Sequence, residues 1–419
     1  MEPNPEHSMA AQTRTAEYLS RPLVSILAAI SLSHLLNDMI QSVLPSIYPI
    51  LKRSFNLSFG QIGIVTLAYQ LTASLLQPFI GQYTDRKPME YLLPGGMCVT
   101  FAGVLLLAVA PTFPVLLIGS SMLGMGSAIF HPEGSRVARL SSGGRLGLAQ
   151  SLFQLGGNSG SAIGPLLASF VVLASGQTGV AWFSLAAICG AVILLGVSRW
   201  YKGTRQFASI HSKSPLLVAP KLSQRHVHLS IGILAVLILS KYLYLASFTS
   251  YYMFFLMNKF NVSLKQAQLH LFLFLGAVAL GTLVGGPVGD RLGRRIVIWC
   301  SILGVLPFSL LLPHANLFWT GMLSCVIGLV IASAFSAILV YAQELVPGKV
   351  GLISGLFFGF AFGMGGIGAA SLGILADHTS VIFVYKVCAY LPAIGLLTGL
   401  LPDDKSGRLA DGGDLLPEI

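Results

Sequence analysis

Charged residues are scarce in this sequence. Asp, Glu, Lys and Arg make up only 10% of its 419 residues, whereas a soluble domain carries about 25%. Hydrophobic residues make up 54%, and the mean hydropathy is +0.78. So few charges cannot cover a soluble globule of this length, which excludes soluble enzymes, nucleic-acid-binding proteins and secreted domains. We therefore predict a polytopic membrane protein that is surrounded by lipid and has no nucleic-acid partner.

Paired cysteine motifs and nucleotide-binding motifs are also missing. The five cysteines are odd in number, each lies in an apolar run, and no CxxC occurs, so we expect buried free thiols. No Gly-x-x-x-x-Gly-Lys-Ser/Thr motif occurs, so the chain has no P-loop of its own for ATP. No long soluble segment is present to hold a catalytic site. We predict that the protein is not an enzyme and needs no cofactor.

Long apolar runs predict the fold. A spanning helix needs about 20 apolar residues, and breaking the chain at charges, Pro and Gly leaves twelve such runs. We predict an all-α membrane protein whose spans are approximately 23–51, 59–83, 91–110, 113–135, 146–173, 179–198, 229–257, 266–289, 296–312, 316–341, 350–375 and 380–400. The polar stretch between the sixth and seventh spans divides the chain. The expected parts are a tail at 1–22, a six-helix bundle at 23–198, a linker at 199–228, a second six-helix bundle at 229–400 and a tail at 401–419.

The placement of Lys and Arg predicts the orientation, because cytoplasmic loops are rich in these residues. If the N-terminus is cytoplasmic, only four of the 25 lie in outside loops, namely Lys52, Arg53, Lys259 and Lys265. We predict that both termini and the linker are cytoplasmic and that the net charge of +10 mostly reflects this bias. The first apolar run is longer than a signal-peptide core and lacks a cleavage pattern, so we expect a retained helix.

The two halves of the sequence resemble each other. Gly-x-x-x-Asp-Arg occurs at 81–86 and again at 286–291, and similar runs open the predicted spans at 147–153 and 351–357. These matches share an offset of 204 or 205 residues, which indicates an internal duplication. Two six-helix halves related by an axis along the membrane normal are an established transporter plan.

These motifs also resemble those of a known family. The run 286–295 reads Gly-x-x-x-Asp-Arg-x-Gly-Arg-Arg, the loop signature of the major facilitator superfamily, and the first copy is degraded after Arg86. The runs 31–41, 130–139 and 147–154 are similar to those of the fosmidomycin resistance proteins of bacterial inner membranes. This resemblance covers all but the tails and the linker. It implies a proton-coupled drug exporter in that membrane.

Ionisable side chains inside the spans are the candidates for proton coupling, because a charge at mid-span costs at least about 2.5–3.5 kcal/mol. His34 and Asp38 lie four residues apart on one helix face, and His131 and Glu133 flank Pro132. A carboxyl group in a low-dielectric cavity is more easily protonated. We predict proton coupling by Asp38, Glu133, His34 and His131. The alternative for each is a structural hydrogen bond or a salt bridge that holds a closed state.

Cations and uncharged polar side chains are the candidates for substrate binding. Lys241 lies inside the seventh span and needs an anion, either Asp38 or a substrate phosphonate or carboxylate. At an offset of 204, the charges of the fourth span have no counterparts in the second half, which favours a functional role for them. The predicted substrate-binding residues are Arg136, Lys241, Gln150, Gln154, Asn158, Gln41 and Tyr244. We predict no metal site, because Arg136 and Lys241 would repel a cation.

Two further patterns predict helix packing and gating. Small residues spaced by four allow close helix contact, and we predict packing at Gly156, Gly160, Gly164, Pro165, Gly355 and Gly359. The pattern at 160–165 also resembles part of the antiporter signature of drug exporters. A carboxylate beside a helix N-terminus is stabilised, and arginines near it can pair with acids of the opposite half. We predict a latch on the cytoplasmic face formed by Gly81, Asp85, Arg86, Gly286, Asp290, Arg291, Arg294 and Glu344.

These expectations combine into one functional prediction. We predict a monomeric secondary transporter that exports a small polar or anionic compound, such as fosmidomycin, in exchange for protons by alternating access. One alternative is a proton-coupled uptake symporter for a phosphorylated metabolite or sugar acid. Another is a membrane-embedded enzyme with His131-Pro132-Glu133 as its site. The sequence leaves open the direction of transport and whether Asp38 pairs with Lys241.

Overall fold

The computed structural model describes residues 23–57, 59–211 and 223–402, and it contains no strand in those ranges. The helices of the first half are α2 (Val24–Ser46), α3 (Tyr48–Ser54), α4 (Phe59–Arg86), α5 (Leu92–Val109), α6 (Phe113–Leu140), α7 (Leu146–Ser175), η1 (Gly176–Trp182) and α8 (Phe183–His211). Those of the second half are α9 (Gln224–Phe260), α10 (Leu264–Leu292), α11 (Arg294–Ile302), η2 (Leu303–Val305), α12 (Leu306–Leu311), η3 (Leu312–His314), α13 (Leu317–Ala332), α14 (Ala334–Leu345), α15 (Val350–His378), α16 (Val381–Cys388) and η4 (Leu391–Leu400).

Twelve segments of the described chain are long and apolar enough to cross a membrane, which confirms the predicted all-α fold of twelve membrane helices. Some of these segments contain more than one helical element. The tenth is interrupted at Ser333, between α13 and α14, and the twelfth continues from α16 into the 3-10 helix η4, which begins at Leu391-Pro392. Proline lacks the N–H that an α-helix needs and favours such a change.

The predicted linker is partly helical. α8 continues to His211, and α9 begins at Gln224 behind Ser223, whose hydroxyl accepts the N–H of His226. Both helices therefore extend into the range 199–228. Charged residues mark where the apolar run stops, but a helix can continue into water beyond that point. The tails at 1–22 and 403–419 lie outside the described residues, as does 212–222.

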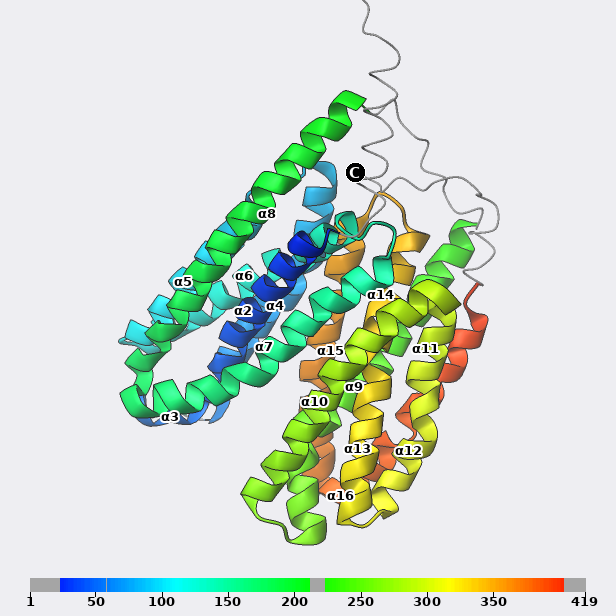
Figure 1. Ribbon diagram of the computed structural model, residues 1–419. Coiled ribbons are helices and arrows are strands. Elements are labelled where there is room, and N and C mark those ends of the chain that lie inside the picture. Colours follow the sequence, from blue (N-terminus) through cyan, green and yellow to red (C-terminus); the bar gives the residue numbers. More distant parts are fainter. Residues whose placement is uncertain (1–22, 58, 212–222, 403–419) are drawn as a thin grey trace, which may run out of the picture.

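The two halves form separate six-helix groups that meet mainly along two helix pairs. α4 packs against α15, and α7 packs against α10. The groups approach each other at the upper end of Figure 1 and splay apart at the lower end. At the upper end, backbone meets backbone where Gly81 faces Gly351 and Gly147 faces Gly286, so that an added Cβ would clash with the opposing carbonyl. We call this the closed end.

The two glycine rows have different packing partners. A Cβ at Gly156, Gly160 or Gly164 of α7 would clash with α2, which belongs to the same half. A Cβ at Gly355 or Gly359 of α15 would clash with the carbonyls of Gln77 and Ser74 on α4, which belongs to the other half. The first row therefore tightens one bundle, whereas the second lets the two halves close on each other.

The cysteines are free, as expected, but they are not all buried. Cys98, Cys189 and Cys300 are exposed, and only Cys388 is buried. The prediction of burial was wrong because an apolar run in a membrane helix places part of its side chains toward lipid, where an apolar group gains nothing from protein contact.

Candidate functional site

A cavity of about 780 Å³ lies between the two halves, away from the closed end. The first half contributes residues of α2 and α7, from Ser42 to Ser46 and from Gln154 to Pro165. The second half contributes residues of α9, α10, α13, α14 and α15. Its volume is in the range that holds a drug-sized ligand. The cavity is therefore the first candidate for a binding site.

Lys241 is the cation in the lining of this cavity. Its side chain is buried, with only 4% of the residue exposed. Nζ lies 3.4 Å from the carbonyl oxygen of Ala332 and 5.5 and 5.6 Å from the ring centroids of Phe335 and Tyr242. Among the described residues it has no carboxylate within ion-pair distance. One long hydrogen bond and two aromatic rings only partly compensate the charge of a buried ammonium group. Lys241 therefore favours the binding of an anion.

The other predicted substrate residues fall into two groups. Gln154 and Asn158 line the cavity, and Asn158 Nδ2 donates to Thr282 Oγ1 of the opposite half over 2.9 Å. The remaining four lie outside the lining. Gln41 accepts hydrogen bonds from Tyr69 and Ser127, Gln150 accepts one from Ser135, Tyr244 packs against Phe248, and Arg136 lies at the closed end.

His34, Asp38 and His131 form a cluster inside the first half, in which both histidines are buried and Asp38 is partly exposed. The Nε2 atoms of the two histidines are 3.3 Å apart. Asp38 Oδ2 lies 3.3 Å from His34 Nε2, and Oδ1 lies 3.5 Å from His131 Nε2. A Cβ at Gly157 of α7 would lie 2.5 Å from His34 Nε2, so this glycine makes the room that the cluster needs. The structure thus adds a third residue, His131 of a second helix, α6, to the pair that helical spacing predicted on α2.

The hydrogen bonds behind the histidines define their tautomers. His34 Nδ1 lies 2.7 Å from the carbonyl oxygen of Phe153, and His131 Nδ1 lies 2.9 Å from that of Ser127. A carbonyl only accepts, so each Nδ1 carries the hydrogen. In the neutral ring, Nε2 is then an acceptor. Two acceptor nitrogens and a carboxylate converge on one point, and such an arrangement needs a proton or another cation between them.

The same three side chains could hold a metal ion. Each offers one ligand atom, and these atoms lie within 4.8 Å of one another. The sequence predicts no metal site here, because Arg136 and Lys241 would repel a cation. In the structure Arg136 is paired with two carboxylates, so its repulsion of a cation at the cluster is weaker than the sequence suggests. A single proton on one Nε2 satisfies the cluster equally well.

Glu133 and Arg136 belong to the closed end. Arg136 Nη2 lies 2.6 Å from Asp85 Oδ1, and Nη1 lies 3.1 Å from Glu133 Oε1. Thr84 donates to Glu133 through its hydroxyl and accepts from Arg136 through its carbonyl oxygen. The two acids and the arginine therefore join α4 to α6, and neither Glu133 nor Arg136 lines the cavity.

The two predicted loop aspartates cap helices of the opposite half. Asp85 of α4 accepts the backbone N–H groups of Gly351 and Leu352 at the start of α15, over 2.8 and 2.7 Å. Asp290 of α10 accepts those of Gly147 and Leu148 at the start of α7, over 2.8 and 2.9 Å. A carboxylate on unpaired N–H groups at a helix N-terminus is a favourable pairing. We call these the Asp85 cap and the Asp290 cap.

Each cap has its own arginine. Arg294 Nη1 lies 3.0 Å from Asp290 Oδ1, and Nη2 lies 3.1 Å from Glu344 Oε1. The first loop has Met89 at the position of Arg294, and Arg136 of α6 pairs with Asp85 instead. The charges of the fourth span have no counterparts in the second half, which favoured a role in transport. The structure gives another reason for Arg136, because it pairs with Asp85 where the first loop has no arginine. Arg86 and Arg291 are exposed at the last turns of α4 and α10.

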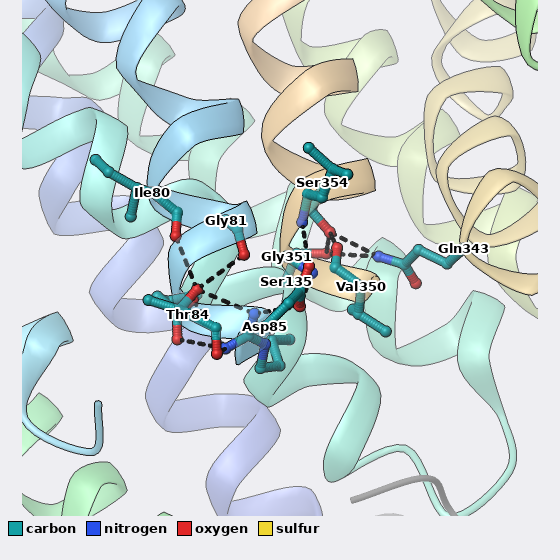
Figure 2. Close-up of polar contacts among 12 residues, drawn as sticks. Ile80, Gly81, Thr84, Asp85, Ser135, Gln343, Val350, Gly351 and Ser354 are labelled. Atoms are coloured by element: carbon teal, nitrogen blue, oxygen red, sulfur yellow. Dashed lines mark hydrogen bonds and ion pairs between the residues drawn. The ribbon is translucent and has the colours of Figure 1, made fainter. Parts of the chain in front are cut away.

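A cluster of polar side chains that the sequence did not single out lies between the caps. Gln343 Nε2 donates to Ser135 Oγ over 3.1 Å and to Ser354 Oγ over 2.9 Å. Figure 2 shows these three residues beside Asp85 and Gly351. Because Ser135 belongs to the first half and the other two to the second, the cluster adds hydrogen bonds across the closed end. A single Gln and two Ser carry no sequence signal that could have identified them.

Aromatic rings connect the cavity to the histidine cluster. The Phe335 ring lies beneath Lys241 and is 5.0 Å from the ring of Phe358, which in turn is 5.0 Å from that of His131. Phe362 also contacts His131, at 4.9 Å. Rings of the second half therefore cover the cluster in the first.

Comparison with known proteins places the chain in a family. A sequence profile of the Major Facilitator Superfamily matches residues 30–263 and 233–414. The chain belongs to this superfamily. Its members are transporters, not enzymes, so this chain is a multi-pass membrane transporter.

Two relatives cover nearly the whole chain. The chain is 56% identical to the fosmidomycin resistance protein of Escherichia coli strain K12 over 404 residues, which are 96% of this chain and 98% of the relative. It is 40% identical over 401 residues to the MFS-type transporter YfnC of Bacillus subtilis strain 168, covering 94% and 97% of the two chains. The resemblance to the fosmidomycin resistance family is thereby confirmed.

Solved structures share the fold. The fucose:proton symporter FucP of E. coli has a TM-score of 0.67 and 14% identity, covering 90% of this chain and 98% of that one. A bacterial homologue of the iron transporter ferroportin, in an outward-facing state, has a TM-score of 0.69 and 14% identity, covering 89% and 99%. At this identity the likeness shows the fold alone.

Proposed function

We propose that this chain exports a small anionic compound of the phosphonate class, with fosmidomycin as its type, in exchange for protons. The observation that carries the proposal is Lys241, a buried cation without a carboxylate partner among the described residues, in the cavity between the halves. The relative that is 56% identical bears the name of fosmidomycin resistance. Fosmidomycin is a phosphonate, so its anionic group is a chemical match for Lys241.

The proton is held by the histidine cluster. Both Nδ1 atoms donate to carbonyls, so the proton resides on an Nε2, and Asp38 serves as the counter-ion. Glu133 is tied to Arg136 and Thr84, so we assign it to the closed end and not to proton transfer.

Alternating access follows from the two ends of the molecule. The closed end faces the cytoplasm in this proposal, because that orientation leaves only four of the 25 lysines and arginines in outside loops. The cavity is then on the outer side. Rocking of the halves would break the two caps and open the cavity to the cytoplasm. We place the protein in the bacterial inner membrane with both termini cytoplasmic. We propose that it works as a monomer, without a cofactor, and is driven by the proton gradient.

Uptake by proton symport is a second candidate, and one observation favours it. The rings of Phe335 and Phe358 join Lys241 to His131, so a proton on the cluster and an anion at Lys241 would attract each other across a low-dielectric region. Attraction favours simultaneous binding, which is a property of a symporter. The relative's name favours export instead.

Proteoliposomes that contain a pH dye test the proposal. Fosmidomycin added outside drives protons out of the lumen if the protein is an antiporter, and the lumen becomes alkaline. It carries protons inward if the protein is a symporter, and the lumen becomes acidic. The response should vanish in Asp38→Asn and in Lys241→Met, whereas Arg86→Gln, at an exposed position on the same half, should retain it. Fosmidomycin flux with no proton signal in the parent protein would refute proton coupling.

A further inference from the structure

The cavity has two chemically different walls. The wall formed by α2 and α7 is rich in hydroxyl and amide groups, from Ser42, Ser46, Gln154, Asn158 and Ser161. The wall formed by α9 and α10 is mostly apolar, with Leu245, Ala246, Met253, Leu271, Phe274, Leu275 and Val278. A cavity for a purely hydrophilic solute would not need the second wall, because water-covered apolar surface is unfavourable.

The apolar wall begins at the cation and runs toward the open end. Lys241, Leu245, Thr249 and Met253 follow one another at intervals of four residues along α9, and all four line the cavity, so this row is apolar beyond the cation except for Thr249. Leu275 and Leu271 extend the wall along α10, one turn apart. An extended molecule with its anionic group at Lys241 would therefore lay its body along these side chains.

Further polar groups of both halves line the same cavity as Lys241. Asn158 and Thr282 are joined by a hydrogen bond of 2.9 Å, and Ser336 lies one residue from Phe335, whose ring faces the ammonium. The hydroxyl of Ser336 is buried and has no hydrogen-bond partner within the protein. The hydroxyl of Ser336 is therefore open to a hydrogen bond with an oxygen-rich head group in the cavity.

We infer that the transporter takes amphipathic organic anions, with a phosphonate or carboxylate head at Lys241 and an aliphatic body along α9 and α10. This inference rests on the proposed function, because it uses the same anion site. It adds a prediction that fosmidomycin alone does not make. Binding strengthens with the length of the apolar body, up to the length of the wall.

Binding of a homologous series to the purified protein in lipid nanodiscs, measured by calorimetry, tests this. The probes are methyl-, propyl- and pentylphosphonate, with pentylammonium as the matched cation of equal chain length. Burial of one CH₂ contributes about 0.8 kcal/mol, so the Kd should fall by up to about fourfold per methylene and up to about 200-fold from methyl to pentyl. Pentylammonium should not bind.

Two kinds of variant separate the head from the body. Leu275→Asn should flatten the series, whereas Leu275→Met, which keeps the wall apolar, should retain the slope. Lys241→Met should abolish binding of the whole series.

Three outcomes would count against the inference in different ways. A flat series that still depends on Lys241 would overturn the amphipathic class and leave the anion site standing. A steep series that persists in Lys241→Met would show unspecific partitioning and also overturn it. Failure of every phosphonate, fosmidomycin included, to bind the parent would instead refute the proposed function.

Discussion

The Asp85 cap offers a direct way to shift the balance between the two open states. Asp85 accepts two backbone N–H groups of α15 and the guanidinium of Arg136, and only 10% of its side chain is exposed. Asn at this position keeps one acceptor oxygen but turns an N–H₂ group toward a donor. We therefore expect Asp85→Asn to destabilise the closed end without changing the cavity.

The magnitude follows from the hydrogen bonds that this substitution removes. A hydrogen bond to a charged group contributes about 1.5–3 kcal/mol, and a buried donor left unpaired costs about 1–3 kcal/mol. We take about 3 kcal/mol in total. Because each 1.4 kcal/mol is a factor of ten, the ratio of cytoplasm-open to outward-open molecules should rise about 100-fold.

Labelling of one cysteine in the cavity measures this ratio. Ser161 lines the cavity and is exposed, so Ser161→Cys can react with a membrane-impermeant maleimide. In inside-out vesicles the rate of labelling should rise up to about 100-fold when Asp85→Asn is added. The same protein without Ser161→Cys gives the background from the five natural cysteines. Arg86→Gln, which changes a neighbouring charge outside the cap, should have no effect. Unchanged labelling in Asp85→Asn would refute the assignment of the cap as a contact of one state only.

Three more predictions test other parts of the site. Lys241→Met should raise the Kd of fosmidomycin at least about tenfold in calorimetry, because the charge-assisted hydrogen bond to the anion is removed; an unchanged Kd would refute the anion site. His34→Gln should retain fosmidomycin binding but lose the proton signal in proteoliposomes, and a normal signal would exclude the histidine cluster as the proton site. Gly355→Ala should increase labelling of Ser161→Cys from the cytoplasmic side, because its Cβ would clash with Gln77. Gly363→Ala, with no atom within 4 Å of the added Cβ, is its control, and equal labelling in the two would contradict the packing argument.

Features that repeat along one helix, or between the halves, could be predicted from the sequence. The twelve helices, the caps at Asp85 and Asp290, and the glycine rows depend on hydropathy, duplication or regular spacing, all of which are local patterns. The pairing of His34 with Asp38 is of the same kind, because four residues make about one helical turn.

Contacts that depend on how helices meet could not be predicted in this way. Glu133 and Arg136 are predicted from the sequence to act in transport because they lack counterparts in the second half. The structure shows that Arg136 pairs with Asp85 across α4 and α6. The sequence does show that the first loop has no arginine at the position equivalent to Arg294, which pairs with Asp290 in the second loop. Only the fold shows that Arg136, on another helix, takes its place beside Asp85.

The position of Phe335 and Phe358 between Lys241 and His131 could not be predicted for a different reason. The chain has 24 phenylalanines, and many apolar side chains of such a protein face lipid. Nothing in the sequence distinguishes the two that lie between Lys241 and His131 from those on the outer surface.

Uphill transport tests most directly whether a proton gradient drives an anion out of the cell through this protein. Inside-out membrane vesicles that contain the protein are made acidic inside, and accumulation of radiolabelled fosmidomycin is followed in the lumen. We expect accumulation above the external concentration, which collapses when a proton ionophore removes the gradient and is absent in Asp38→Asn. Accumulation that only reaches the external concentration, with or without the gradient, would contradict proton-driven export.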